Sequence, residues 1–187
     1  MTYANTQSLE QAFFRKRDAD LIAEMRRREN EQTRKKMLTE ISGITNEDVL
    51  QQLIAQDIHA EKLAAFLLIP ILEVAWADGE VDPAERNVVF HAIEEAGILR
   101  GSVALRLTEQ WLERRPDPRL MKIWTTYTRE LMGQMTPEAR KCVKQTVLEH
   151  ARAVAEASGG VLGFGRLSSD EKAVLHDLEE AFEIQSK

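Results

Sequence analysis

The first 42 residues contain neither glycine nor proline, and this unbroken stretch is the strongest constraint on the fold. Within it, eleven consecutive residues, 26–36, carry no apolar side chain. Eleven helical residues make about three turns, and turns without an apolar stripe cannot pack on a core through one. Acid-before-base pairs four residues apart, such as Glu24 with Arg28, favour a solvated helix. The sequence therefore predicts one long helix over residues 7–41 that projects into solvent.

This predicted arm, residues 1–45, has a chemistry of its own. Residues 1–40 carry nine Lys and Arg against seven Asp and Glu, whereas residues 41–187 carry sixteen against twenty-four. Because acids are interleaved with the bases, the arm is only mildly basic and we do not predict nucleic-acid binding. A solvated or self-associating helix and a peripheral lipid contact are the alternatives to docking on a partner protein. For docking, we expect the contacts to come from an apolar and basic set: Phe13, Phe14, Arg17, Leu21, Arg27 and Arg28.

The remaining residues, 46–187, are predicted to form one compact helical bundle. Helix-start signals recur along them, as in Asp82-Pro83-Ala84-Glu85, which places Asp at the N-cap, Pro at N1 and Glu at N3. Thr45 is the predicted N-cap of a short helix that follows it. A helix over 60–77 is apolar on nearly all sides, and Pro70 should kink it. No alternating run typical of a strand exceeds four residues, so the fold class is all-α.

An internal similarity divides the bundle. Residues 79–96, GEVDPAERNVVFHAIEEA, align with residues 165–181, GRLSSDEKAVLHDLEEA, once one residue is dropped. In both copies a capping residue precedes an acid, a base and an apolar helix that carries His and then Glu-Glu-Ala. The alignment predicts two pseudo-repeated halves, each a helical hairpin. The alternative is that two helix starts converge on this pattern through capping alone.

Composition excludes several classes of protein. A single Cys142 cannot form an internal disulfide, which argues against a disulfide-stapled secreted scaffold. The most apolar stretch, residues 64–77, is shorter than the roughly 20 residues of a membrane span, and no apolar leader begins the chain. The four histidines have no zinc-ligand spacing, and no nucleophile and base form a recognisable pair. We therefore expect a cytoplasmic protein that is not an enzyme.

Carboxylates are densest in the turn at residues 78–85. Asp78, Glu80, Asp82 and Glu85 lie within eight residues and offer the oxygen ligands that Ca²⁺ or Mg²⁺ prefers. The spacing is not that of an EF-hand. One interpretation is purely structural, with Asp78 in a turn and Asp82 and Glu85 in a capping box. The other is a site for a divalent cation.

The stretch AWADGEVDPAERNVVFHAIEEAGI resembles the TerB-like family of tellurite-resistance proteins, and the likeness extends over about residues 60–185. Its hallmark is an apolar helix ending in Ala-Asp-Gly, followed by a hydrophobic residue and a glutamate that opens the next helix. The resemblance implies a compact helical bundle with internal two-fold pseudo-symmetry. It also implies a divalent metal held by Asp78, Glu80 and Glu85. The second copy departs from the pattern, with Phe164 and Arg166 at the positions of Asp78 and Glu80.

The arm lies outside that family. The stretch SLEQAFFRKRDADLIAEMRRREN looks like the N-terminal helix of the small inhibitory subunit of α-proteobacterial ATP synthases, through Glu10, Phe13, Leu21, Arg27 and Arg28. Two functions follow as expectations. The first is a non-enzymatic, regulatory binding module that engages a partner protein through its N-terminal helix. The alternative is an inhibitor of a rotary F-type ATPase that acts through the same helix.

Overall fold

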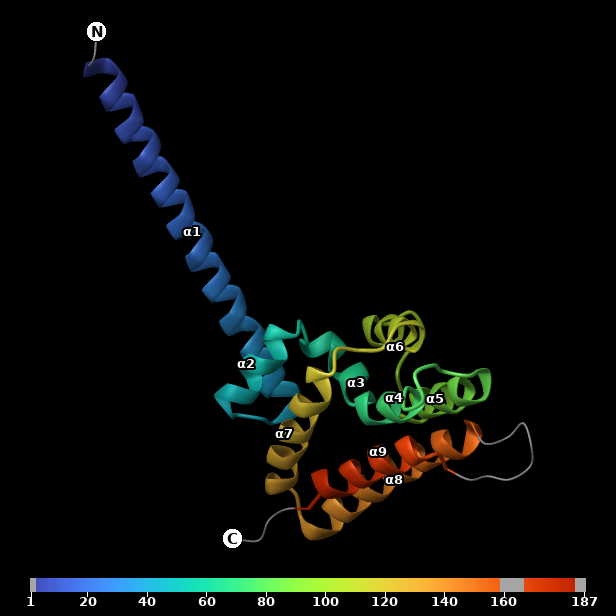
Figure 1. Ribbon diagram of the computed structural model, residues 1–187. Coiled ribbons are helices and arrows are strands. Elements are labelled where there is room, and N and C mark those ends of the chain that lie inside the picture. The colour runs from blue at the N-terminus through green and yellow to red at the C-terminus, as the bar shows by residue number, and fades with distance from the viewer. Residues whose placement is uncertain (1–2, 159–166, 184–187) are drawn as a thin grey trace.

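Helices account for all the regular secondary structure in the part of the chain that the computed structural model describes, residues 3–158 and 167–183, which confirms the all-α class (Figure 1). The side chains of residues 3–15, 18 and 158 also lie outside the description. In chain order the elements are α1 (Tyr3–Ser42), α2 (Glu47–Ala55), the 3₁₀ turn η1 (Ala60–Lys62), α3 (Leu63–Phe66), α4 (Ile69–Ala75), α5 (Pro83–Glu95), α6 (Val103–Glu113), α7 (Arg119–Gln134), α8 (Pro137–Ser158) and α9 (Ser169–Ala181).

Two helix starts have the predicted capping box. At α5 the Asp82 carboxylate accepts a hydrogen bond from the Glu85 N–H, and the Glu85 carboxylate accepts one from the Asp82 N–H. At α9 the side chains of Ser168 and Glu171 do the same. Each box satisfies two backbone donors that a helix start leaves free. The division of the bundle into two related halves stays a prediction, and Phe164 and Arg166 lie outside the described residues.

The start of α2 corrects one expectation. The N-cap is Asn46 rather than Thr45, because the Asn46 side-chain oxygen accepts hydrogen bonds from the N–H groups of Asp48 and Val49. The Asn46 amide also donates to Glu130 of α7 at 2.9 Å. This second bond joins the start of α2 to a residue of α7 that is 84 positions away in sequence, so local spacing does not reveal it.

Pro70 breaks the predicted helix 60–77 instead of kinking it. The chain forms η1 and α3, passes through Leu67 and Leu68, and restarts as α4 with Pro70 in its first turn. A proline within a helix has no N–H to donate, and its ring clashes with the carbonyl four residues earlier. At a helix start that missing donor costs nothing, so the restart removes the conflict.

The core forms around α4. All seven of its residues are buried, including Glu73. α8 packs against both α4 and α5, and α7 and α9 complete the enclosure of α4. Aromatic pairs join the layers: the rings of Trp124 on α7 and Phe182 lie edge to face at 5.6 Å, as do those of Phe66 and Tyr127. Such offset geometry suits the charge distribution of aromatic rings.

Among the described residues, the C-terminal end of α1 joins this body, and the rest of the helix extends away from it (Figure 1). Leu38 is fully buried, and the Ser42 hydroxyl donates to the Leu38 carbonyl at 2.7 Å. Gly43 then turns the chain with a φ of 72°, a conformation that glycine adopts without strain. Across the described residues, no helix is both long enough and apolar enough to cross a bilayer.

Candidate functional site

The junction between α1 and the body fixes the direction of the arm. Lys35 is 7% exposed, and its ammonium donates to the Glu47 carboxylate of α2, with Glu31 a turn away on α1. The hydrogen bond to Glu47 raises the pKa of Lys35 above its ordinary value. Arg34 also reaches Asp57, at 3.4 Å. Together these contacts attach two consecutive residues of α1 to two separate segments of the body.

Beyond the junction, α1 exposes apolar side chains. Leu21 is 59% exposed, Ile22 50% and Met25 62%, and we call these three residues the arm patch. Leu21 and Met25 are four residues apart, and Ile22 and Met25 are three apart, so all three share one side of the helix. A contiguous exposed apolar surface rimmed by charge is typical of an interaction site.

Arginines occupy the turns of α1 next to the arm patch. Glu24 accepts hydrogen bonds from Arg27 at 2.9 and 3.0 Å and from Arg28 at 3.0 Å, and these bonds lower the pKa of Glu24. Arg27 and Arg28 are both exposed, as is Arg17. Of the predicted contact residues, the structure therefore places Leu21 and three arginines on solvated turns of α1. The side chains of Phe13 and Phe14 lie outside the described residues.

The acidic turn between α4 and α5 separates its carboxylates. Asp78 and Glu80 are exposed, and Asp78 accepts from the Glu80 N–H at 3.2 Å. Glu85 is 2% exposed and faces inward as part of the capping box. Burial raises the pKa of Glu85 to about 7, and the nearby charges of Asp82, Asp78 and Glu171 add to the shift. Glu85 is thus partly protonated near neutral pH, and a protonated carboxyl group is a poor cation ligand.

A divalent-cation site at Asp78, Glu80 and Glu85 stays a prediction. In the described part of the chain, no three His, Cys, Asp or Glu side chains are grouped as a metal-ligand set. Melting curves of the full chain with and without Ca²⁺ or Mg²⁺, at constant ionic strength, test the prediction. Ligand at 100 times its dissociation constant adds about 2.7 kcal/mol. Asp78→Asn should remove that shift, and superimposed curves would reject the site.

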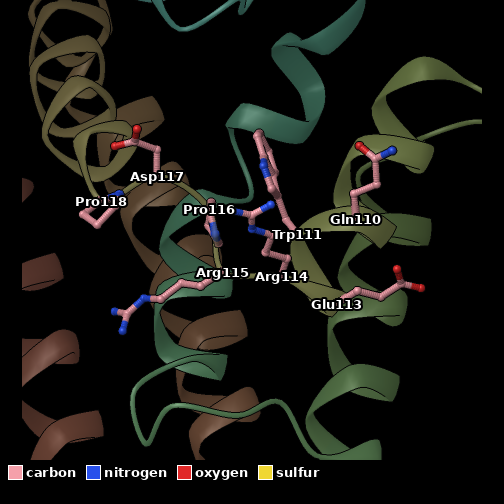
Figure 2. Close-up of a pocket in the computed structure, with 8 residues that line it drawn as sticks. All are labelled: Gln110, Trp111, Glu113, Arg114, Arg115, Pro116, Asp117 and Pro118. Atoms are coloured by element: carbon pink, nitrogen blue, oxygen red, sulfur yellow. The ribbon is translucent and has the colours of Figure 1, made fainter.

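A pocket of about 660 Å³ lies where α6 ends and the chain turns into α7 (Figure 2). Its lining mixes an indole, prolines and charged groups: Gln110, Trp111, Glu113, Arg114, Arg115, Pro116, Asp117 and Pro118. The carbonyls of Trp111 and Leu112 accept hydrogen bonds from the side chains of Trp76 and Arg86, which hold this helix end against α4 and α5. The lining set offers charge pairing and stacking, and it contains no histidine, cysteine or serine.

Sequence reasoning missed an ion pair that Arg115, a lining residue of this pocket, makes with Glu73. Glu73, in the middle of the buried α4, accepts a hydrogen bond from Arg115 at 2.8 Å. The other carboxylate oxygen of Glu73 has no hydrogen-bond partner among the described atoms. A buried carboxylate is costly unless it is paired, so Arg115 compensates it only in part. A lone acid inside the apolar stretch 64–77 was the available signal, but the sequence does not identify its partner.

Comparison of the chain with protein-family models, with curated proteins and with solved structures finds no significant match. The resemblances to the TerB-like family and to the ATP synthase inhibitory subunit therefore stay predictions.

Proposed function

We propose that this protein is a regulatory binding module that engages a partner protein through α1, with the helical body as the base of that arm. The observation that carries the proposal is the arm patch: Leu21, Ile22 and Met25, each at least half exposed on a helix held only at its other end. At 1.5 Å per residue, Met25 lies roughly 20 Å along the helix from Leu38, where α1 enters the core. At that distance the body does not cover the arm patch.

The contacts at the junction support the same proposal. A helix attached by a single point would swing freely and lose entropy on docking. Lys35 and Arg34 instead reach Glu47 and Asp57 on different segments, so the arm has a set direction before it binds. Such pre-organisation lowers the cost of binding. Amphipathic helices that dock through three or four anchors at helical spacing are a common mode of recognition.

The test is capture of a partner by tagged full-length protein. The double variant Leu21→Ser/Met25→Ser removes apolar surface from the arm patch without touching the body, and we expect it to lose capture. Met37→Ser is the matched control, because Met37 is 52% exposed on the same helix but lies on another side of it near the junction. Equal capture by the double variant and the wild type would overturn the proposal.

The alternative function has its own measurement. A rotary F-type ATPase as the partner predicts that added full-length protein lowers ATP hydrolysis by that enzyme. Arg27→Ala/Arg28→Ala and the arm-patch double variant should both relieve the inhibition. Hydrolysis unchanged by the wild-type protein rejects this alternative and leaves the binding-module proposal intact.

A further inference from the structure

A second apolar surface lies on the body, between α5 and α6. A cavity of about 380 Å³ there has four apolar lining residues: Phe90, Ile93, Ile98 and Leu105. Glu94, Glu109 and Arg100 form its charged rim. We call these seven residues the α5–α6 groove. α6 makes its main contacts with η1 and α3, whereas α5 makes its own with α8 and α4, so the two helices leave this space between them.

The arm patch complements the α5–α6 groove. Both are apolar at the centre, and the net charge of the segment that carries the arm patch is opposite to that of the groove lining. Residues 21–30, which contain the arm patch, carry Arg26, Arg27 and Arg28 against Glu24 and Glu29, a net charge of +1. The groove has two acids to one arginine at its rim. The arm and the body as wholes also have opposite net charges, since residues 1–40 carry a net charge of +2 and residues 41–187 a net charge of −8.

The arm cannot reach the groove of its own body. α1 continues as helix from the arm patch to the junction, and its free part points away from the body (Figure 1). Two arms side by side in register would bring their Arg26–Arg28 triplets together, and like charges in contact oppose pairing. Docking in the groove of another molecule requires no bending of α1 and brings no arginine triplets together.

We propose that the arm patch of one copy docks in the α5–α6 groove of a second copy. This inference rests on the proposed function, since it names the partner of the same arm. The contact is heterologous, with different surfaces on the two molecules. Two copies that exchange arms close a dimer, and copies that pass arms in one direction form a longer assembly.

Sedimentation velocity on the full-length protein over a range of concentrations tests the proposal. We expect self-association that Leu21→Glu/Met25→Glu weakens by at least about tenfold, the factor that corresponds to 1.4 kcal/mol. Glu109→Arg, at the rim of the groove, should weaken it as well without disturbing the core. Arg26→Glu combined with Glu109→Arg should restore part of the loss. Met37→Glu on α1 and Leu67→Glu on the body are controls, because both residues are exposed outside the two surfaces.

Mixing two variants gives the sharpest result. The arm variant Leu21→Glu/Met25→Glu keeps an intact groove, and the groove variant Leu105→Glu/Glu109→Arg keeps an intact arm. We expect each to be monomeric alone and the mixture to form a one-to-one heterodimer. Wild-type protein that stays monomeric at every concentration overturns the inference, as does association that only the arm variant disrupts. If such a monomeric protein still loses partner capture in the arm variant, the proposed function stands and only the second copy as partner is rejected.

Discussion

The body and the arm of this protein use the same kinds of residues in opposite ways. In the body, Leu38 and the residues of α4 are removed from water, and even the charged Glu73 is buried. On the arm, Leu21, Ile22 and Met25 face solvent, and Glu24 pairs with arginines of its own helix. Burial of apolar side chains therefore stabilises the body, whereas ion pairs within α1 and its backbone hydrogen bonds stabilise the arm.

Lys35 lies at the boundary between the buried body and the exposed arm. Both it and Arg28 are basic residues of α1 that pair with a glutamate, yet Lys35 is 7% exposed and its closest partner, Glu47, belongs to another helix. The difference teaches that position relative to the core, rather than residue type, decides what a side chain contributes. The effects of substitution should accordingly decrease from the core, through the boundary, to the arm.

Leu38→Ala should have the largest effect. Leu38 is fully buried where α1 enters the core, and deleting a buried leucine side chain leaves a cavity that costs about 2–5 kcal/mol. Urea unfolding followed by circular dichroism measures the loss in free energy of unfolding. Ile41→Ala is the matched control on the same helix, because Ile41 is 61% exposed and its truncation should change that free energy by about 0.5 kcal/mol or less. Equal effects of the two variants would show that the end of α1 is not part of the core.

Glu85→Gln should change how stability depends on pH. The pKa of Glu85 is raised from 4.5 to about 7 in the folded protein, so the folded state binds more protons than the unfolded state between those values. The contribution of Glu85 to the free energy of unfolding therefore falls as pH rises from about 4.5 to 7, by about 1–3 kcal/mol. Glutamine does not titrate and still accepts the hydrogen bond from Asp82.

The measurement is chemical unfolding of the wild type and Glu85→Gln from pH 5 to pH 8. The advantage of the variant should grow across that range and then level off. Glu80→Gln, at an exposed position in the same turn, should show no such trend. A difference between Glu85→Gln and the wild type that does not vary with pH would contradict the raised pKa.

The capping boxes show which features of the fold the local sequence predicts. Asp82 with Glu85 and Ser168 with Glu171 were predictable because a cap and its N3 acid are three residues apart and need no distant partner. The N-cap of α2 was predicted at Thr45 instead of Asn46, because both residue types cap helices. The contact that distinguishes Asn46 is with Glu130, 84 residues away, and local sequence does not show it. The all-α class followed from periodicity, which is also local.

The candidate site was less accessible to sequence reasoning. Leu21, Arg27 and Arg28 were predicted contact residues because the charged stretch 26–36, which follows Leu21 and contains both arginines, cannot be buried through an apolar stripe. Ile22 and Met25 lie on the same predicted apolar side but were not among the predicted contact residues, and the structure shows both at least half exposed. The α5–α6 groove and the pair of Glu73 with Arg115 depend on how helices pack, and no spacing along the chain encodes either of them.

Lys35→Met tests the boundary. Methionine keeps most of the apolar stem of lysine and removes the ammonium that pairs with Glu47. Because Glu47 is exposed, it regains water when the pair is lost, and we expect a loss of only about 1 kcal/mol in free energy of unfolding. Urea unfolding measures it, and Lys36→Met, at an exposed position beside it, is the control. A loss as large as that from Leu38→Ala would place Lys35 in the core rather than at its edge.

Glu24→Gln should have the smallest effect, and it should be confined to the arm. The variant loses the ion pairs with Arg27 and Arg28, which join residues of one exposed helix and touch nothing in the body. Global unfolding should therefore be unchanged. The pairs act only on local opening of α1, so amide hydrogen exchange between residues 20 and 30 should become faster by roughly two- to fivefold. High salt should abolish the difference, because exposed pairs are screened.

Glu29→Gln is the control, since Glu29 forms no ion pair among the described residues. A change in the global unfolding transition would mean that the arm and the body unfold as one unit, and the contrast between them would fail.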